Sequence, residues 1–262
     1  MERELAGLVK DWVHQAGDYI RQHMQADLKV TSKSSRTDLV TELDQWTEKF
    51  LRTKISQAYP DHAVMGEEAM GTNPTSMAGP VWIIDPIDGT ANFVSQQENF
   101  VIMLAFYQDG QGRFAAIYDP IRDRYLEAIK GQGVYLNDQP LKLRFADRQL
   151  DQGLVACNGH MALKNQLNIQ AILDQSMGVR MYGSAGIEIM SLVKGATIAY
   201  ISPRLKPWDI AAGAVICQEL GLVCRQFDGQ EIDLMTTNPT IFAYPSVYQK
   251  IRQHLDHELA KQ

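Results

Sequence analysis

The stretch that decides the fold is WIIDPIDGTANF, residues 82–93. It begins as a short apolar run of the kind that makes a buried strand. The run stops at Asp85-Pro86, where we expect the strand to leave its sheet and turn. The apolar runs that follow predict three successive strands with turn residues between them, at 100–107, 114–120 and 124–129. Amphipathic helices are predicted at 2–24 and 41–58, so this half of the chain is expected to be helices on a largely antiparallel sheet.

The second half alternates between apolar strand patterns and helix patterns, which implies an α/β layer. Strands are expected at 153–158, 179–183, 197–202 and 221–227, and helices at 163–177, 184–195 and 208–221. The predicted fold class is therefore α+β followed by α/β, in a chain long enough for one large domain or two small ones. We place the internal boundary near residue 145, which gives halves of 1–145 and 146–262 without a true linker.

Composition excludes several classes of protein. The net charge of −6, with 31 acidic and 25 basic residues, argues against a broad nucleic-acid footprint. No run of 18 apolar residues exists, so no membrane span is expected, and the first twenty residues lack the hydrophobic core of a signal peptide. The three cysteines cannot all pair and form no CxxC. We therefore expect a reducing, cytoplasmic compartment and neither a nucleic-acid nor a membrane partner.

The turn after residue 84 carries groups for two kinds of ligand. Asp85 and Asp88 are two carboxylates three residues apart, on a turn that a proline stiffens. Gly89 permits close backbone approach, and Thr90 can begin a helical turn with free N–H groups. The loop therefore offers oxygens to a hard cation and donors to a phosphate, although an ordinary capped turn uses the same residue types.

Acidic residues also stand at three other positions that begin or end elements. Glu67 and Glu68 follow an apolar run, Asp209 begins a helix beside a tryptophan, and Asp44 lies in the first turn of another helix. Each has an ordinary alternative: solvated acids at a strand end, a helix cap, and an acid favoured by the helix dipole. Lys33, in the polar stretch before the second helix, would by default be a surface lysine.

These alternatives weaken when the acids are considered as one set. If Asp44, Glu67, Asp85, Asp88 and Asp209 converge, each pair of charges at ~4 Å repels by about 4 kcal/mol at an effective dielectric constant near 20. Such a cluster requires cations or protons. Magnesium is the natural occupant because all the candidate ligands are oxygens, and no histidine or cysteine joins them as a zinc site would require.

Four ordered motifs resemble the inositol monophosphatase family of magnesium-dependent, lithium-sensitive sugar phosphatases. The two signatures look like 82–93 and 207–221, and the segments 66–68 and 38–44 match in type and order. The resemblance runs over most of the chain. It implies a layered α-β-α-β-α sugar phosphatase fold, a phosphoric monoester hydrolase acting on a small phosphorylated substrate, and a homodimer, since many members form one.

The same resemblance implies a metal set. Glu67, Asp85 and the backbone carbonyl of Ile87 would hold a first magnesium ion, and Asp85, Asp88 and Asp209 a second, with Asp85 bridging. A third, weaker ion would lie near Glu67, and the resemblance also places Glu67 among the catalytic residues. Two or three Mg²⁺ ions are thus the expected cofactors.

It also implies roles around the metals. Asp44 and Thr90 would orient and deprotonate the attacking water, and the N–H groups of Gly89 and Thr90 would bind phosphate. Glu68 would support the site from behind the ligands. Lys33 matches a lysine on a mobile loop that approaches the site.

The substrate side departs from the pattern of animal members. A glutamate that contacts inositol hydroxyls there is replaced by Ser202, and Glu188 replaces a small residue. Arg204 and Lys206 add positive charge that favours a second phosphate or merely balances the acids. The resemblance implies inositol monophosphate or a related sugar or polyol phosphate as substrate, and these departures make fructose 1,6-bisphosphate and NADP(H) alternatives. A regulatory binding protein on this scaffold is the non-enzymatic alternative.

Overall fold

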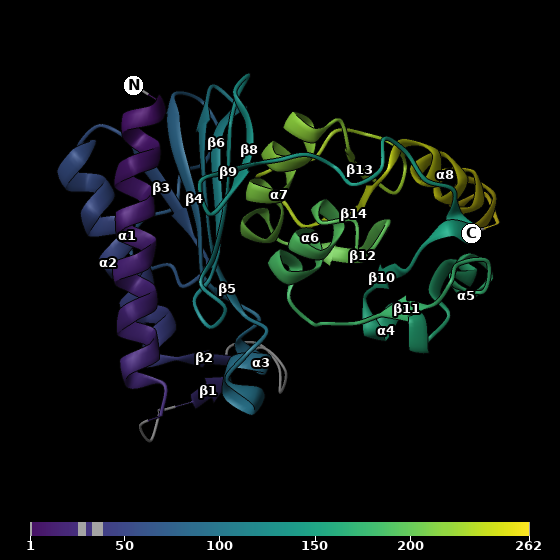
Figure 1. Ribbon diagram of the computed structural model, residues 1–262. Helices are drawn as coiled ribbons and strands as arrows, with labels where there is room; N and C mark the ends of the chain where they lie inside the picture. The colour runs from purple at the N-terminus through teal and green to yellow at the C-terminus, as the bar shows by residue number, and fades with distance from the viewer. Residues whose placement is uncertain (1, 26–29, 33–38, 262) are drawn as a thin grey trace.

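Helices and sheets alternate in five layers across the molecule (Figure 1). The computed structural model describes residues 2–25, 30–32 and 39–261. Helices α1 (Glu2–His23) and α2 (Glu42–Ala58) cover one face of a large sheet, and α6 (Ala185–Val193) and α7 (Pro207–Leu220) fill the space between it and a second sheet. Helix α8 (Pro245–Leu259) covers the outer face of the second sheet. The predicted layered fold is confirmed.

The large sheet has seven strands in chain order, and only its first pair, β3 with β4, is parallel. This confirms the predicted antiparallel character. The strands are β3 (Ala63–Gly66), β4 (Pro80–Asp88), β5 (Val101–Gln108), β6 (Gln111–Asp119), β7 (Arg124–Ile129), β8 (Gly133–Leu136) and β9 (Gln139–Leu141). Separately, β1 (Val30–Ser32) and β2 (Leu39–Thr41) form an antiparallel pair.

Strand β4, which lies next to the edge strand β3, does not stop at Asp85-Pro86, so the predicted end of this strand was wrong. It continues to Asp88 because an irregularity against β5 absorbs the proline: Asp85 lies opposite Met103, and Asp88 opposite Val101. Three steps along β4 thus match two along β5, which is the signature of a bulge. Proline, which cannot donate to the ladder, is tolerated at such a position.

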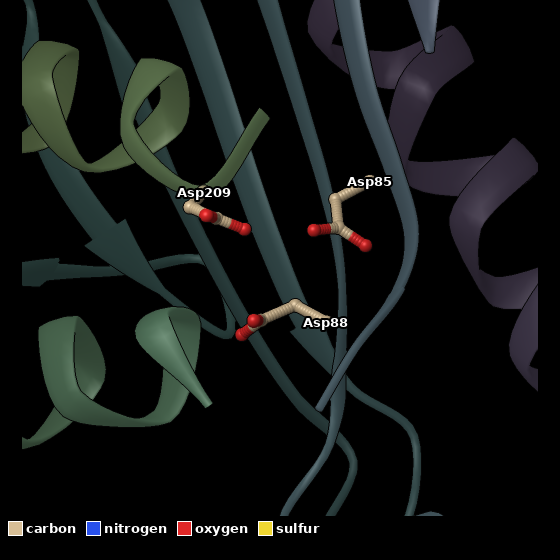
Figure 2. Close-up of side chains that lie close together, drawn as sticks. All are labelled: Asp85, Asp88 and Asp209. Carbon is tan, nitrogen blue, oxygen red and sulfur yellow. The ribbon is translucent and has the colours of Figure 1, made fainter. Parts of the chain in front are cut away.

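The bulge decides where the two carboxylates point. In a regular strand, residues three apart face opposite sides of the sheet. Here Ile83 packs in the core beneath α6 and α7, whereas Ile84 and Ile87 both pack in the core beneath α1 and α2. The extra residue therefore turns Asp85 and Asp88 to the same face, toward α7 (Figure 2).

The second sheet has five strands in the order β11-β10-β12-β14-β13. Its first three strands are parallel and the other pairs antiparallel, so this α/β half is mixed. The strands are β10 (Val155–Cys157), β11 (Val179–Arg180), β12 (Ala199–Leu205), β13 (Val223–Gln226) and β14 (Asn238–Ala243). The predicted strand at 179–183 is thus shorter than expected, and β14 and α8 were not predicted.

One predicted helix, 163–177, is instead a series of short pieces. These are α4 (Gly159–Leu163), η2 (Gln166–Asn168) and α5 (Gln170–Leu173). Asn165, Leu167 and Asn168 adopt positive φ, a conformation that asparagine tolerates better than most residues and that ends a helix.

The remaining short elements are α3 (Thr90–Gln96) and η1 (Leu150–Gln152). The predicted boundary near residue 145 falls between β9 and η1, and the division into two domains stays a prediction. Within the described residues, no helix is both long enough and apolar enough to cross a membrane.

Candidate metal and phosphate site

Three aspartates from the two halves of the chain meet between β4 and α7. One carboxylate oxygen from each of Asp85, Asp88 and Asp209 lies within 4.8 Å of the others, and the side chains point toward one another (Figure 2). Asp85 and Asp88 are 1% and 7% exposed, and Asp209 is half-buried. The predicted convergence of these three acids is therefore present in the structure.

Their mutual repulsion is strong because little water screens it. Two unit charges 4.8 Å apart repel by about 3.5 kcal/mol at an effective dielectric constant near 20. Burial, followed by the charge of a neighbouring acid, raises the pKa of Asp85 and of Asp209 well above the usual range. At neutral pH the cluster must therefore take up protons or cations.

Asp88 is held by the beginning of α6. Its carboxylate accepts hydrogen bonds from the Ser184 hydroxyl, from the backbone N–H of Ala185 at 3.1 Å and from that of Gly186 at 2.6 Å. Burial raises the pKa of Asp88 to about 6, and these three donors oppose the rise. A helix of the second half thus orients a carboxylate of the first.

Asp209 has the capping role that was the ordinary alternative for it. Its Oδ2 accepts the backbone N–H of Lys206 at 2.7 Å, at the first turn of α7, which Pro207 begins. Capping does not exclude metal binding, because the carboxylate has a second oxygen. The cap instead fixes which way the side chain points.

Asp85 fits a cation most clearly. Its Oδ1 is buried and has no hydrogen-bond partner among the residues that the structure describes. More than nine in ten buried polar groups in native proteins have a partner, and a buried carboxylate oxygen without one is costly. The donor set around it consists of carboxylates and contains no histidine or cysteine, which suits Mg²⁺.

Asp44 and Thr90 meet beside this cluster. Thr41 caps α2 in a reciprocal box with Asp44, whose Oδ2 accepts the Thr41 backbone N–H at 2.8 Å. The Thr90 hydroxyl lies 3.0 Å from Asp44 Oδ1 and 3.1 Å from the carbonyl oxygen of Ile87, and it can donate to either. Burial raises the pKa of Asp44 to about 6, against hydrogen bonds that lower it.

Gly89 is required by both its conformation and its surroundings. Its φ of +95° belongs to the left-handed region. A Cβ there would lie 3.0 Å from Ser184 Cβ and 3.1 Å from the carbonyl oxygen of Asn99. Only glycine therefore brings the start of α3, with Thr90, this close to the N-terminus of α6.

Glu67 and Glu68 follow β3, whose last residue, Gly66, pairs with Ile84 next to Asp85. The charge of Glu67 contributes to the raised pKa of Asp85 and of Asp44, so it lies within electrostatic reach of both. Lys33 lies outside the described residues, and its predicted place on a loop stays a prediction.

Glu48 is a residue that sequence reasoning missed. It is fully buried in α2, and its carboxylate accepts the backbone N–H of Glu68 at 2.6 Å. One signal was available: Glu48 stands on the same helical stripe as the buried Leu51 and Ile55, a place where a charged side chain calls for an explanation.

The expected substrate-side residues line a cavity of about 320 Å³ together with Asp88 and Asp209. They are Glu188, Ser202 and Arg204. Glu188 Oε2 and the Ser202 hydroxyl are buried, and neither has a hydrogen-bond partner in the described part of the chain. Burial raises the pKa of Glu188 to about 7. A larger hollow of about 840 Å³ between α7 and β13 contains none of the predicted site residues.

The sequence of this chain is similar to those of known phosphatases along almost its whole length. The model of the inositol monophosphatase family matches residues 1–260, which confirms the resemblance seen in the motifs. An inositol-1-monophosphatase of Bacillus subtilis is 36% identical over 261 residues, covering 97% of each chain. A protein of Pasteurella multocida named Nus factor SuhB is 31% identical, over 86% of this chain and 85% of that protein.

A solved structure extends the comparison to three dimensions. The crystal structure of an IMPase/NADP phosphatase complexed with Mg²⁺ and phosphate superposes with a TM-score of 0.89 at 28% identity. The match covers 96% of this chain and 95% of that one. With 96% of this chain covered, the similarity extends through both of its halves.

Proposed function

Because the chain belongs to the inositol monophosphatase family, we propose that it is a magnesium-dependent phosphomonoesterase that hydrolyses inositol monophosphate or a related small sugar or polyol phosphate. The observation that carries this proposal is the meeting of Asp85, Asp88 and Asp209, with a buried Asp85 oxygen that has no hydrogen-bond partner among the residues described by the structure. The cavity beside them has room for a small phosphate ester.

We propose the metal ligands on the same basis. Glu67, Asp85 and the Ile87 carbonyl would hold one Mg²⁺, and Asp85, Asp88 and Asp209 a second, with a third near Glu67. When bound, these ions neutralise the phosphate and the leaving oxygen during in-line displacement. The hydrogen bonds from Ser184, Ala185 and Gly186 to Asp88 support this assignment, since they keep one ligand in a fixed orientation before any metal arrives.

The other residues would act on the water and the phosphate. The Thr90 hydroxyl, when it donates to Asp44 Oδ1, has its lone pairs free to accept a proton. In the reaction, Thr90 Oγ1 takes a proton from the attacking water while its own proton passes to Asp44. The backbone N–H groups of Gly89 and Thr90 bind the phosphate, and Glu68 supports the loop that carries Glu67.

The choice of substrate is proposed to lie with Glu188, Ser202 and Arg204. Glu188 Oε2 and the Ser202 hydroxyl have no hydrogen-bond partner among the described residues, which suits substrate hydroxyls. Arg204, exposed at the same cavity, suits a second anionic group. A solved relative is named an IMPase/NADP phosphatase, so NADP(H) stays an alternative substrate, together with fructose 1,6-bisphosphate.

Three further properties complete the proposal: a homodimer, inhibition by lithium and a cytoplasmic location. Met177, Met181 and Tyr182 are large apolar side chains exposed within six residues of one another, which would suit contact with a second copy. The three cysteines are buried and unpaired, which fits a reducing compartment. Light scattering after gel filtration tests the dimer, and lithium titration of the activity tests the inhibition.

A regulatory binding protein is the second candidate, because a relative over most of the chain carries the name of a Nus factor. The test is phosphate release with Mg²⁺ from inositol 1-phosphate, fructose 1,6-bisphosphate and NADP. We expect turnover by the parent, loss by Asp88→Asn, and no change in Asp174→Asn, a matched exposed aspartate. No turnover by the parent on any ester, together with stoichiometric capture of a macromolecule, would favour the second candidate instead.

A further inference from the structure

A buried ion pair lies directly behind the segment that carries Glu67. Glu48 is 0% exposed, and Arg52, one helical turn further along α2, donates from Nε to Glu48 Oε1 at 2.8 Å. The desolvation of two charges is costly, and a buried pair is weak as a source of stability unless further hydrogen bonds satisfy it. The remaining contacts of these two residues therefore show what the pair does.

The carboxylate of Glu48 holds the backbone on the C-terminal side of Glu67. Its Oε2 accepts the N–H of Glu68 at 2.6 Å, and its Oε1 accepts the N–H of Met70 at 3.0 Å. Backbone N–H groups bonded to a buried carboxylate are among the stronger hydrogen bonds in proteins. This end of the segment is consequently fixed to α2.

Arg52 holds the other side through Asn73. The guanidinium donates to the carbonyl oxygen of Val64 at 2.9 Å and to Asn73 Oδ1 at 2.8 Å. Asn73 in turn accepts the N–H of Gly66 at 3.0 Å and donates to the Gly66 carbonyl oxygen at 3.1 Å. The backbone on both sides of Glu67 is thus bonded to one network of three side chains.

Gly66 completes the arrangement because it leaves space for the carboxylate. A Cβ at this position would lie 2.4–2.6 Å from the carboxyl atoms of Glu48. No side chain fits there without displacing Glu48, so the close approach of the segment to α2 depends on glycine.

We infer that Glu48, Arg52 and Asn73 are positioning residues that hold Glu67 in place for magnesium binding. This inference rests on the proposed function. None of the three is proposed to touch the metal or the substrate. They order the segment in advance, so that binding does not have to immobilise it. Residues that orient ligands in this way typically change metal affinity 10–100-fold when replaced.

Asn73→Ala tests the inference most cleanly, because it removes the link to Gly66 and leaves the Glu48–Arg52 pair intact. Asn137→Ala is the matched control: Asn137 also braces a loop, accepting the N–H of Tyr125 at 2.7 Å and donating to the Asp123 carbonyl oxygen at 2.9 Å. Magnesium affinity is measured without substrate, from the shift in Tm with Mg²⁺ concentration, and separately from the Mg²⁺ dependence of phosphate release.

We expect Asn73→Ala to raise the magnesium dissociation constant about 10–100-fold, with kcat restored to within about threefold of the parent by saturating Mg²⁺. Asn137→Ala should lower Tm without changing that constant. Arg52→Lys, which keeps the charge beside Glu48 but not the fork of donors, should act as Asn73→Ala does, and it serves if that variant does not fold.

The inference would be overturned if Asn73→Ala and Arg52→Lys both bind magnesium with the dissociation constant of the parent. It would also be overturned if their kcat falls and no Mg²⁺ concentration restores it. The two proposals fail separately. A parent without phosphatase activity whose magnesium affinity still falls in Asn73→Ala would refute the function and keep the positioning role. If the parent is active but both variants keep its magnesium dissociation constant, the positioning role is refuted and the proposed function stands.

Discussion

Replacing Asp85 with asparagine should stabilise the metal-free protein at neutral pH and at the same time abolish its response to magnesium. Asp85 is fully buried, its Oδ1 has no protein partner in the described structure, and acids surround it. Without a cation, this carboxyl must either stay charged among charges or hold a proton. Asparagine has a similar shape and requires neither.

The magnitude follows from the less costly of these two options. Staying ionised between Asp88 and Asp209, both within 4.8 Å, costs about 7 kcal/mol if both neighbours are ionised and the effective dielectric constant is near 20. Protonating an acid with an ordinary pKa of 3.8 at pH 7 costs about 4 kcal/mol, at 1.36 kcal/mol per unit. The second figure is therefore the upper limit of the gain.

Part of that gain is lost because the amide N–H₂ of asparagine also needs partners, at a cost of about 1–3 kcal/mol. We expect a net stabilisation of about 2 kcal/mol, or roughly 4–8 °C in Tm. The effect should vanish toward pH 4. The pKa of Asp85 is raised in the folded state, so above pH 3.8, its ordinary pKa, the folded parent holds a proton that the unfolded chain releases. Below that pH both states are protonated, and the difference in stability between parent and variant disappears.

The assay is thermal unfolding of the parent, Asp85→Asn and Asp174→Asn, in chelator and in excess Mg²⁺, at pH 4.5 and 7. The parent and the exposed control should gain about 2.7 kcal/mol at a magnesium concentration 100 times the dissociation constant, and Asp85→Asn should gain nothing. Two results would contradict this prediction: an Asp85→Asn variant that is less stable than the parent in chelator at pH 7, or one that magnesium stabilises as much as the parent.

Three other outcomes are expected. The folded-state pKa values of Asp44 and Asp88 are each raised to about 6. The stability of the metal-free protein should therefore fall as pH rises from 4 to 7, because the folded state binds more protons than the unfolded state. Urea unfolding in chelator tests this, and a stability that rises over this pH range would contradict the effect of burial on these two acids. Thr90→Ala should lower kcat about 10²–10⁴-fold, the usual range for a lost proton-transfer group. Thr90→Ser keeps the hydroxyl and should retain most of the parental kcat. If steady-state assays show the same loss of kcat in both variants, proton transfer through the hydroxyl is excluded. Gly89→Ala, at a φ of +95° and with close neighbours, should cost at least about 1–3 kcal/mol in urea unfolding, and an unchanged midpoint would show that the turn relaxes freely.

The acids of the site were predictable from the sequence, but the way they meet was not. The motif around Asp85 and Asp88 identified both carboxylates, yet their common direction depends on a bulge against β5. That bulge depends on which residues of a distant strand lie opposite, and no local pattern carries this information.

Two other elements show the same limit. The pattern over 163–177 is helical in composition, but asparagines in the left-handed region divide it into short pieces. Asparagine only permits that conformation, and tertiary packing decides whether it is adopted. Glu48 was overlooked because its carboxylate accepts hydrogen bonds from the backbone N–H groups of Glu68 and Met70. These groups come some twenty residues later in the chain and approach α2 only when the protein folds.

The most direct test of the shared cation site is anomalous diffraction from crystals soaked in Mn²⁺, which replaces Mg²⁺ at oxygen sites. We expect an anomalous peak about 2.1 Å from carboxylate oxygens of Asp85, Asp88 and Asp209. A map with no peak between β4 and α7, or with Asp85 Oδ1 bonded to a protein donor instead of a metal, would contradict it.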